Sequence, residues 1–133
     1  MISPRSILLK LPAILIMAVI TVLSSQSSIE VIPVFFGVDK IMHFCAFGAL
    51  AFAFGLWFSR ESWLKLPLRN FLICAAAASA FGIFDELHQY FVPGRSSDFW
   101  DWVFDVLGAA AGSAAVLWGS RKLGAGRNAA SAK

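Results

Sequence analysis

Acidic side chains crowd into one short stretch of this 133-residue sequence. The stretch D-E-L-H-Q-Y-F-V-P-G-R-S-S-D-F-W-D-W-V-F-D covers residues 85–105 and holds five of the eight acids, namely Asp85, Glu86, Asp98, Asp101 and Asp105. Carboxyl groups in different surroundings can divide the roles of general acid and general base. An arginine beside them can hold a phosphate or a carboxylate. These residue types point to acid–base chemistry or to the binding of an anionic group.

A second polar group lies upstream. Asp39 and His43 are four residues apart, so a helix would place them on one face, with Lys40 next to Asp39. The chain has two histidines, His43 and His88, and no H-E-x-x-H spacing, so we predict no metal site and no cofactor. No G-x-S-x-G motif is present, so a serine nucleophile of that kind is not indicated.

The segments that carry these residues are very apolar. The chain is 59% hydrophobic and 14% charged, whereas soluble domains are about 45–50% apolar and about 25% charged. Four segments approach the roughly 20 residues that a bilayer crossing needs, at about 7–24, 41–58, 70–89 and 98–119. A cleaved signal peptide is the alternative for the first, but no A-x-A site follows it.

We therefore predict an all-α integral membrane bundle of four transmembrane helices. It occupies residues 1–124, and residues 125–133 are predicted to be a disordered cytoplasmic tail. The net charge of +3 does not indicate nucleic-acid binding, because no zinc-finger spacing or RNA-binding aromatic signature accompanies it. The two cysteines lie inside apolar runs and predict no disulfide framework.

The orientation follows from the basic residues. Nine of the eleven Lys and Arg residues lie before or at the starting edge of the first span, between the second and the third, or after the fourth. The other two connections carry only Lys40 and Arg95. The positive-inside rule then predicts cytoplasmic termini, with the connections 25–40 and 90–97 outside. All the polar residues named above would meet at the outer end of the bundle.

Two features of the last span extend this prediction. Asp105 lies seven residues after Asp98, or roughly 10 Å deeper at 1.5 Å per residue. A charged acid at mid-bilayer costs on the order of 2.5–3.5 kcal/mol, so Asp105 must be shallower, protonated or paired, and we expect it to be functional. The G-A-A-A-G of residues 108–112 predicts a close helix–helix contact at Gly108 and Gly112.

We expect one outward-facing cleft and a single hydrogen-bonded network at this end. Its predicted members are Asp39, His43, Asp85, Glu86, Gln89, Arg95, Asp98 and Asp101. Arg95 is expected either to bridge two acids or to receive an anionic substrate. The simpler alternative is that these residues only cap and solvate helix ends.

Four motifs follow one another along the chain. They are S-S-Q at 24–26, D-K-I-M-H-F-C-A-F-G at 39–48, D-E-L-H-Q-Y-F-V-P-G-R-S-S-D at 85–98 and D-W-V-F-D-V-L-G-A-A-A-G at 101–112. Their order resembles the VanZ-like family. The resemblance implies a small multi-helix protein of the bacterial cytoplasmic membrane, and it links the chain to teicoplanin (glycopeptide) resistance. Family members often carry Asn where this chain has Asp105.

The resemblance and the residues together suggest action on, or binding of, an amphiphilic cell-envelope molecule such as a lipid headgroup, a cell-wall precursor or a glycopeptide. The candidate catalytic residues are Asp39, His43, Asp85 and Glu86. The candidate substrate-binding residues are Gln26, Lys40, Gln89, Arg95, Ser96, Asp98, Asp101 and Asp105. Three alternatives stay open: an enzyme, a binding or transport module, and a structural subunit of a membrane complex. A homo-oligomer also stays open.

Overall fold

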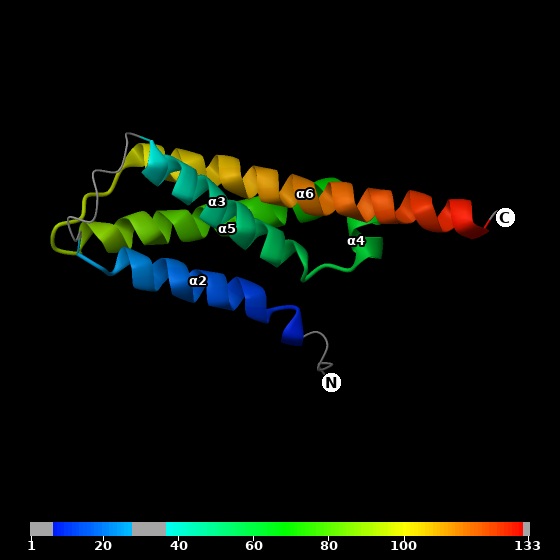
Figure 1. Ribbon diagram of the computed structural model, residues 1–133, viewed down its shortest axis with the longest axis horizontal. Helices are drawn as coiled ribbons and strands as arrows, with labels where there is room; N and C mark the ends of the chain where they lie inside the picture. The colour runs from blue at the N-terminus through cyan, green and yellow to red at the C-terminus, as the bar shows by residue number, and fades with distance from the viewer. Residues whose placement is uncertain (1–6, 28–36, 132–133) are drawn as a thin grey trace.

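The computed structural model describes residues 7–27 and 37–131, with side chains up to Leu123. Five helices follow one another: α2 (Leu11–Ser24), α3 (Val38–Gly55), α4 (Arg60–Lys65), α5 (Pro67–Tyr90) and α6 (Phe99–Ser131). The described residues contain no strand, which confirms the all-α class. The four longer helices run side by side with alternating direction, so α3 and α6 start at the end where α2 and α5 finish (Figure 1).

Three of these helices are long and apolar enough to cross a membrane, namely α3, α5 and α6. The protein is therefore a multi-pass membrane protein by the length and composition of its helices. The fourth predicted span corresponds to α2, which has 14 residues. At 1.5 Å per residue it is about 21 Å long, against a hydrocarbon core of about 30 Å. Four spans, and the side of the membrane on which each terminus lies, stay predictions.

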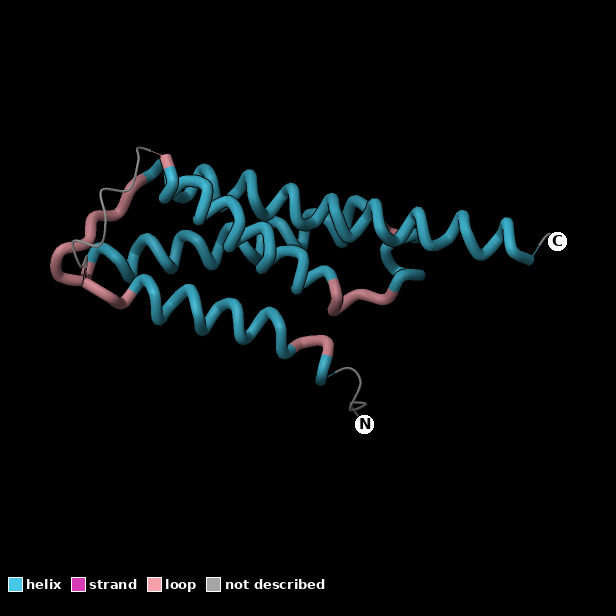
Figure 2. The backbone as a smooth tube through the Cα atoms, viewed as in Figure 1, coloured by secondary structure: helices cyan, strands magenta, loops and turns pink. Residues whose placement is uncertain are grey.

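The start of α2 has a local cause. The sequence predicts one continuous helix from residue 7. In the structure Ile7 and Leu8 are helical, a turn in which Lys10 N–H donates to Ile7 O follows, and α2 begins at Leu11 (Figure 2). Pro12 occupies the second helical position. Proline has no N–H to donate and clashes with the preceding turn, so it is tolerated in the first turn of a helix and not deeper.

Burial in this protein is reversed relative to a soluble bundle. Large apolar side chains cover the outside: Leu15, Leu68 and Phe84 each expose more than 60% of their surface. Acidic residues lie inside the bundle: Asp105 is 0% exposed and Asp85 is 4% exposed. A soluble protein would place these groups the other way round, whereas lipid favours this arrangement.

The closest packing joins α3 to α6. A Cβ added at Gly108 would collide with the backbone carbonyl of Phe44, and one added at Gly112 would collide with the carbonyl of Gly48. Gly48 in turn faces the backbone of Gly108. The predicted close contact at Gly108 and Gly112 is therefore confirmed, and its partner is α3. This contact sets how α3 and α6 are rotated toward each other.

Two boundaries differ from those predicted. The predicted spans leave residues 59–69 as a connection, but Ser59 Oγ accepts from Ser62 N–H at 3.1 Å and caps the short helix α4, which buries Trp63. At the other end of the chain, α6 continues past residue 124 to Ser131. The domain boundary at residue 124 and the disordered tail stay predictions.

A polar end of the bundle as the candidate functional site

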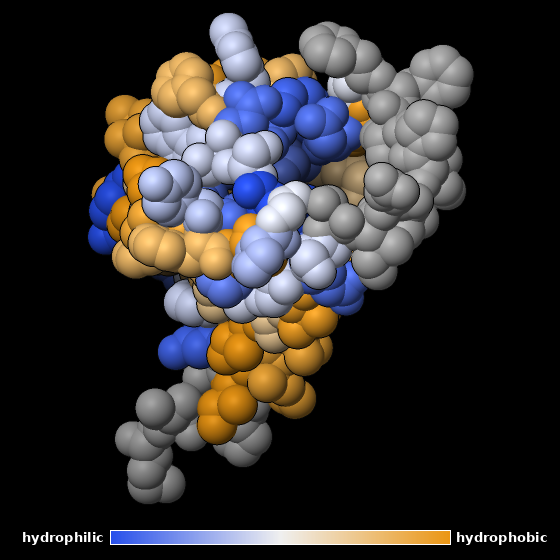
Figure 3. Space-filling view, turned by 90° about the vertical axis from the view of Figure 1, so that its left-hand side faces the viewer, coloured by the Kyte–Doolittle hydropathy of each residue, from blue (hydrophilic) through white to orange (hydrophobic). Residues whose placement is uncertain are grey.

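The ends of four helices meet at one end of the bundle, which we call the polar end. It comprises Ser24–Gln26 at the end of α2, Asp39–His43 in α3, Asp85–Gln89 in α5, and Arg95–Asp105 before and within α6. Figure 3 looks onto this end and shows hydrophilic side chains gathered over it, with apolar side chains around them. The convergence predicted from the sequence is therefore present. The remaining question is which side chain contacts which.

Lys40 is the charged centre of this end. Its ammonium Nζ lies 2.6 Å from Asp98 Oδ2, 2.6 Å from Asp101 Oδ1 and 3.0 Å from Asp39 Oδ2. Bridging two acids was one of the two roles expected of Arg95, and in the structure Lys40 bridges them instead. Position explains the difference. Lys40 lies in the first turn of α3, next to the start of α6, so its flexible stem reaches both neighbouring acids on α6.

Asp98 has three partners at the start of α6. Its Oδ1 accepts from Trp100 N–H at 2.8 Å, so Asp98 itself is the N-cap residue of α6. The Lys40 ammonium and the Trp100 N–H hold the pKa of the Asp98 carboxyl below its usual range. The Asp98 N–H donates to Glu86 Oε2 at 2.8 Å, which joins α6 to the end of α5.

Asp105 pairs with a histidine. His43 Nδ1 lies 2.8 Å from Asp105 Oδ1, and His43 Nε2 lies 3.8 Å from Asp101 Oδ2. The His43 ring also stacks parallel to Phe47, with centroids 6.2 Å apart. Of the possibilities that the sequence left open for Asp105, the structure thus shows a pairing, with His43 as the partner. Asp105 fits against α5 at Gly82, where an added Cβ would lie 2.6 Å from Asp105 Oδ2.

Asp85 belongs to a separate set of contacts between α2 and α5. Its Oδ1 accepts from Ser24 Oγ at 2.6 Å, and its Oδ2 accepts from Gln89 Nε2 at 2.9 Å. All three residues are buried. Next to them, Ser25 Oγ lies 2.9 Å from His88 Nε2 in a more exposed position. These contacts attach the end of α2 to α5 through polar groups.

Arg95 is delivered by a tight turn. Arg95 N–H donates to Val92 O at 3.1 Å, and Gly94 has a φ of 79°. Pro at the second position and a glycine with positive φ at the third are the requirements of a type II turn, which the V-P-G-R sequence meets. The turn brings Arg95 back over the bundle. Its Nε donates to Gln26 O at 3.1 Å and its Nη2 to Leu23 O at 3.0 Å.

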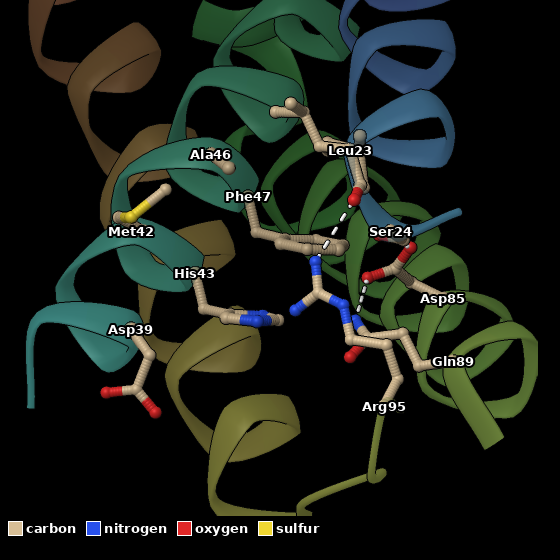
Figure 4. A pocket seen from close by; sticks show the side chains of 11 residues that line it. Leu23, Ser24, Asp39, Met42, His43, Ala46, Phe47, Asp85, Gln89 and Arg95 are labelled. Atoms are coloured by element: carbon tan, nitrogen blue, oxygen red, sulfur yellow. Dashed lines mark hydrogen bonds between the residues drawn. The ribbon is translucent and has the colours of Figure 1, made fainter. Parts of the chain in front are cut away.

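These helix ends enclose a cavity of about 260 Å³. Its apolar lining comprises Ile20, Leu23, Met42, Ala46 and Phe47. Its polar lining comprises Ser24, Asp39, His43, Asp85, Gln89 and Arg95. Figure 4 shows the Arg95 guanidinium reaching into this pocket between His43 of α3 and Asp85 of α5. Among the described residues, the guanidinium bonds only to backbone carbonyls and to no carboxylate.

The structure thus distributes the predicted set over two groups. Asp39, His43, Asp85, Gln89 and Arg95 line the pocket together. The other acids, Glu86, Asp98 and Asp101, lie in the contacts around Lys40 and His43 and do not line this pocket. Asp98 lines a neighbouring pocket together with Asp39 and Lys40. Gln26 contributes its backbone carbonyl to Arg95, and Ser96 is exposed in the connection before α6. Among the described residues, no hydrogen bond or ion pair joins the Asp85 contacts to those of Lys40, so the expected network is divided.

Comparison with known proteins identifies the chain. A family model described as VanZ/LLP1 matches residues 6–119. The chain belongs to the VanZ/LLP1 family. The matched range of this VanZ/LLP1 chain contains every residue of the polar end. No curated protein and no solved structure gives a significant match.

Six lining residues of the VanZ/LLP1 pocket were not among the predicted site residues, namely Ile20, Leu23, Ser24, Met42, Ala46 and Phe47. Two of these six contact predicted site residues directly. Ser24 is buried at 5% exposure with its hydroxyl on Asp85, and Phe47 is 1% exposed beneath His43. Phe47 carries a signal in the sequence, because it stands four residues after His43 and so shares its helix face. Ser24 carries a weaker one, as a hydroxyl at the end of an apolar helix.

Proposed function

We propose that this protein binds an amphiphilic cell-envelope molecule in the pocket at its polar end, in the bacterial cytoplasmic membrane. The observation that carries the proposal is the two-sided lining of one cavity, with apolar side chains of α2 and α3 beside charged and amide groups. An amphiphile has the same division between its chain and its headgroup. A lipid headgroup, a lipid-linked cell-wall precursor and an acylated glycopeptide all share this chemistry.

Arg95 is the group that we propose to hold the headgroup. A guanidinium has five N–H donors in a planar fork that fits a phosphate or a carboxylate. Two of the nitrogens, Nε and Nη2, are engaged by backbone carbonyls of the α2 end, which fixes the direction of the group. Nη1 donates to none of the described residues, so it is available to an anionic ligand. Gln89 and His43 offer hydrogen bonds to neighbouring headgroup atoms.

The remaining predicted residues have a supporting part in this proposal. Lys40 holds Asp39, Asp98 and Asp101 together and so fixes the start of α6 against α3. This contact keeps the pocket wall in place without requiring Lys40 to contact the ligand. Preorganised surroundings of this kind lower the entropy that a ligand loses on binding.

Binding can be tested with the full-length protein in nanodiscs of zwitterionic lipid. Anionic phospholipid, a lipid-linked cell-wall precursor and teicoplanin are each titrated, and the dissociation constant is measured for wild type, Arg95→Gln and the control Arg121→Gln. Arg121 is exposed near the far end of α6, so its removal leaves the polar end unchanged. We expect Arg95→Gln to weaken binding of one of these ligands by about tenfold or more, since a charged hydrogen bond contributes about 1.5–3 kcal/mol. Equal binding by all three proteins, or no binding of any ligand, would refute the proposal.

One observation favours an enzyme as the second candidate. His43 lines the pocket, and Asp105 lies 2.8 Å from its Nδ1, as a carboxylate does when it orients a general base. In that case Asp85 and Glu86 would be further candidate acids or bases, and the bound molecule would be transformed. Incubation with radiolabelled lipid and labelled precursor separates the two candidates. Turnover that is lost in His43→Asn favours the enzyme, whereas stoichiometric retention of unchanged ligand favours the binding protein.

A further inference from the structure

Three side chains from three helices meet beneath the pocket. His43 of α3, Glu86 of α5 and Asp105 of α6 each offer one ligand atom, and these atoms lie within 4.8 Å of one another. Around a bound ion with bonds of about 2.0–2.2 Å, neighbouring ligand atoms are roughly 3–4 Å apart. A small inward movement of the side chains is therefore enough to bring all three to one ion.

Two of these side chains have oxygens without a partner. Glu86 Oε1 and Asp105 Oδ2 are buried, and neither has a hydrogen-bond partner among the described residues. Asp105 is 0% exposed and Glu86 is 9% exposed. Each carboxylate uses its other oxygen, for Asp98 N–H in one case and His43 Nδ1 in the other. Buried polar atoms in native proteins nearly always have a partner. We therefore expect a bound group to contact these two oxygens.

The charge balance at the polar end points to a cation. Six carboxyl groups lie there among the described residues: Asp39, Asp85, Glu86, Asp98, Asp101 and Asp105. The permanent cations there are Lys40 and Arg95, and Lys40 already contacts three of the acids. Burying unpaired charge in a membrane protein is costly. A divalent ion between Glu86 and Asp105 would neutralise both carboxylates.

We propose that His43, Glu86 and Asp105 bind one divalent first-row transition-metal ion, of the Zn²⁺ or Mn²⁺ class. One imidazole nitrogen and two carboxylate oxygens form a mixed set that suits such an ion, whereas Mg²⁺ and Ca²⁺ prefer oxygen ligands alone. No motif revealed this set in the sequence, because the three ligands are 43 and 19 residues apart and come together only through packing. Three protein ligands leave a coordination position for water or a ligand atom.

Neighbouring groups hold the three proposed ligands in position. Asp98 N–H orients Glu86, Gly82 gives Asp105 room against α5, and Phe47 stacks on His43. Partners of this kind hold metal ligands in direction and raise metal affinity. Because His43 also lines the pocket, a bound ion would share one residue with the pocket lining. The metal site does not depend on the proposed amphiphile, and it can be tested without one.

The test uses the purified full-length protein in detergent, stripped with a chelator and dialysed against ZnCl₂, MnCl₂ or MgCl₂. The metal content and the dissociation constant are measured for wild type, Glu86→Gln, Asp105→Asn and the matched control Glu61→Gln. Glu61 is an exposed acid whose side chain is 73% exposed and paired with Lys65. We expect one Zn²⁺ or Mn²⁺ per chain in wild type and in Glu61→Gln, and at least tenfold weaker binding in the other two variants.

Thermal unfolding supplies a second measurement that does not depend on metal analysis. An ion that binds only the folded state raises the melting temperature. Zn²⁺ or Mn²⁺ should therefore raise it in wild type and not in Glu86→Gln or Asp105→Asn, while circular dichroism confirms that both variants are helical. If one of these two variants fails to fold, metal binding by the other variant tests the proposal. Metal bound equally by all four proteins is adventitious and overturns the proposal.

A different result would show that Glu86 and Asp105 share a proton and bind no metal ion. In that case wild type binds no ion at micromolar concentrations, and Asp105→Asn or Glu86→Gln melts at a higher temperature than wild type without added metal. This outcome also overturns the metal site, and it leaves the binding of an amphiphile to be judged by Arg95→Gln alone.

Discussion

Lys40 Nζ of α3 lies 2.6 Å from Asp101 Oδ1 of α6, and the two side chains are 19% and 11% exposed. This ion pair joins the two helices that also pack most closely through glycines. Asp98 and Asp39 share the same ammonium, so three acids depend on one cation. Removal of Lys40 would leave these acids to repel one another in a half-buried setting.

We therefore expect Lys40→Met to destabilise the protein strongly. The loss should fall between the roughly 1 kcal/mol of an exposed ion pair and the about 3–5 kcal/mol of a broken buried pair. Lys65→Met is the matched control, because Lys65 pairs with Glu61 at 2.7 Å but is 72% exposed. The free energy of unfolding is measured in detergent by thermal or denaturant unfolding. A loss in Lys40→Met no larger than in Lys65→Met would contradict the assigned role.

The pH dependence of stability should involve Asp98. The Lys40 ammonium lowers the pKa of Asp98 in the folded state, so the carboxylate stabilises the fold above its unfolded pKa of about 3.9. That contribution is lost as the pH falls through the lower folded pKa. Asp98→Asn keeps the helix cap and removes the charge. We expect this variant to be less stable than wild type at pH 7 and to approach wild type below about pH 4.

Unfolding of both proteins across this range provides the measurement, with Glu61→Gln as the control for loss of a surface acid. A constant difference between Asp98→Asn and wild type at every pH would show that the effect comes from the helix cap or from packing, and not from the ion pair with Lys40.

The α3–α6 contact predicts a sharp difference between two small residues of one helix, Gly108 and Ala114. Gly108→Leu adds a side chain where a single Cβ already meets the Phe44 carbonyl, so we expect a loss of about 1–3 kcal/mol or more. Ala114→Leu, on the exposed face of α6, should change stability by less than about 0.5 kcal/mol. Thermal unfolding in detergent is the measurement. Equal melting temperatures for the two variants would show that Gly108 does not pack closely against α3.

The sidedness of the membrane is still a prediction from the basic residues. A reporter fused after Pro93 or Gly37 should behave as external, and one fused after Leu64 as cytoplasmic, because Arg60, Lys65 and Arg69 surround Leu64. Paired reporters that are active on opposite sides provide the measurement. A cytoplasmic signal from the fusion after Pro93 would overturn the four-span topology with cytoplasmic termini.

The sequence by itself determined the helical class, three of the long spans and the end at which the polar residues meet. Long apolar runs can satisfy their backbone in lipid only as helices, and short connections force successive helices to alternate in direction. His43 and Asp39 were predictable on one face of α3 for the same local reason, since a helix repeats every 3.6 residues.

Only the tertiary structure decided the partners. Helical spacing does not state how far each helix is rotated toward its neighbour, and that rotation depends on where backbones approach, at Gly48, Gly108 and Gly112. This rotation places three acids around the Lys40 ammonium, whereas Arg95 lines the pocket. The meeting of His43, Glu86 and Asp105 has the same origin, because contacts between residues far apart in the chain depend on packing between helices.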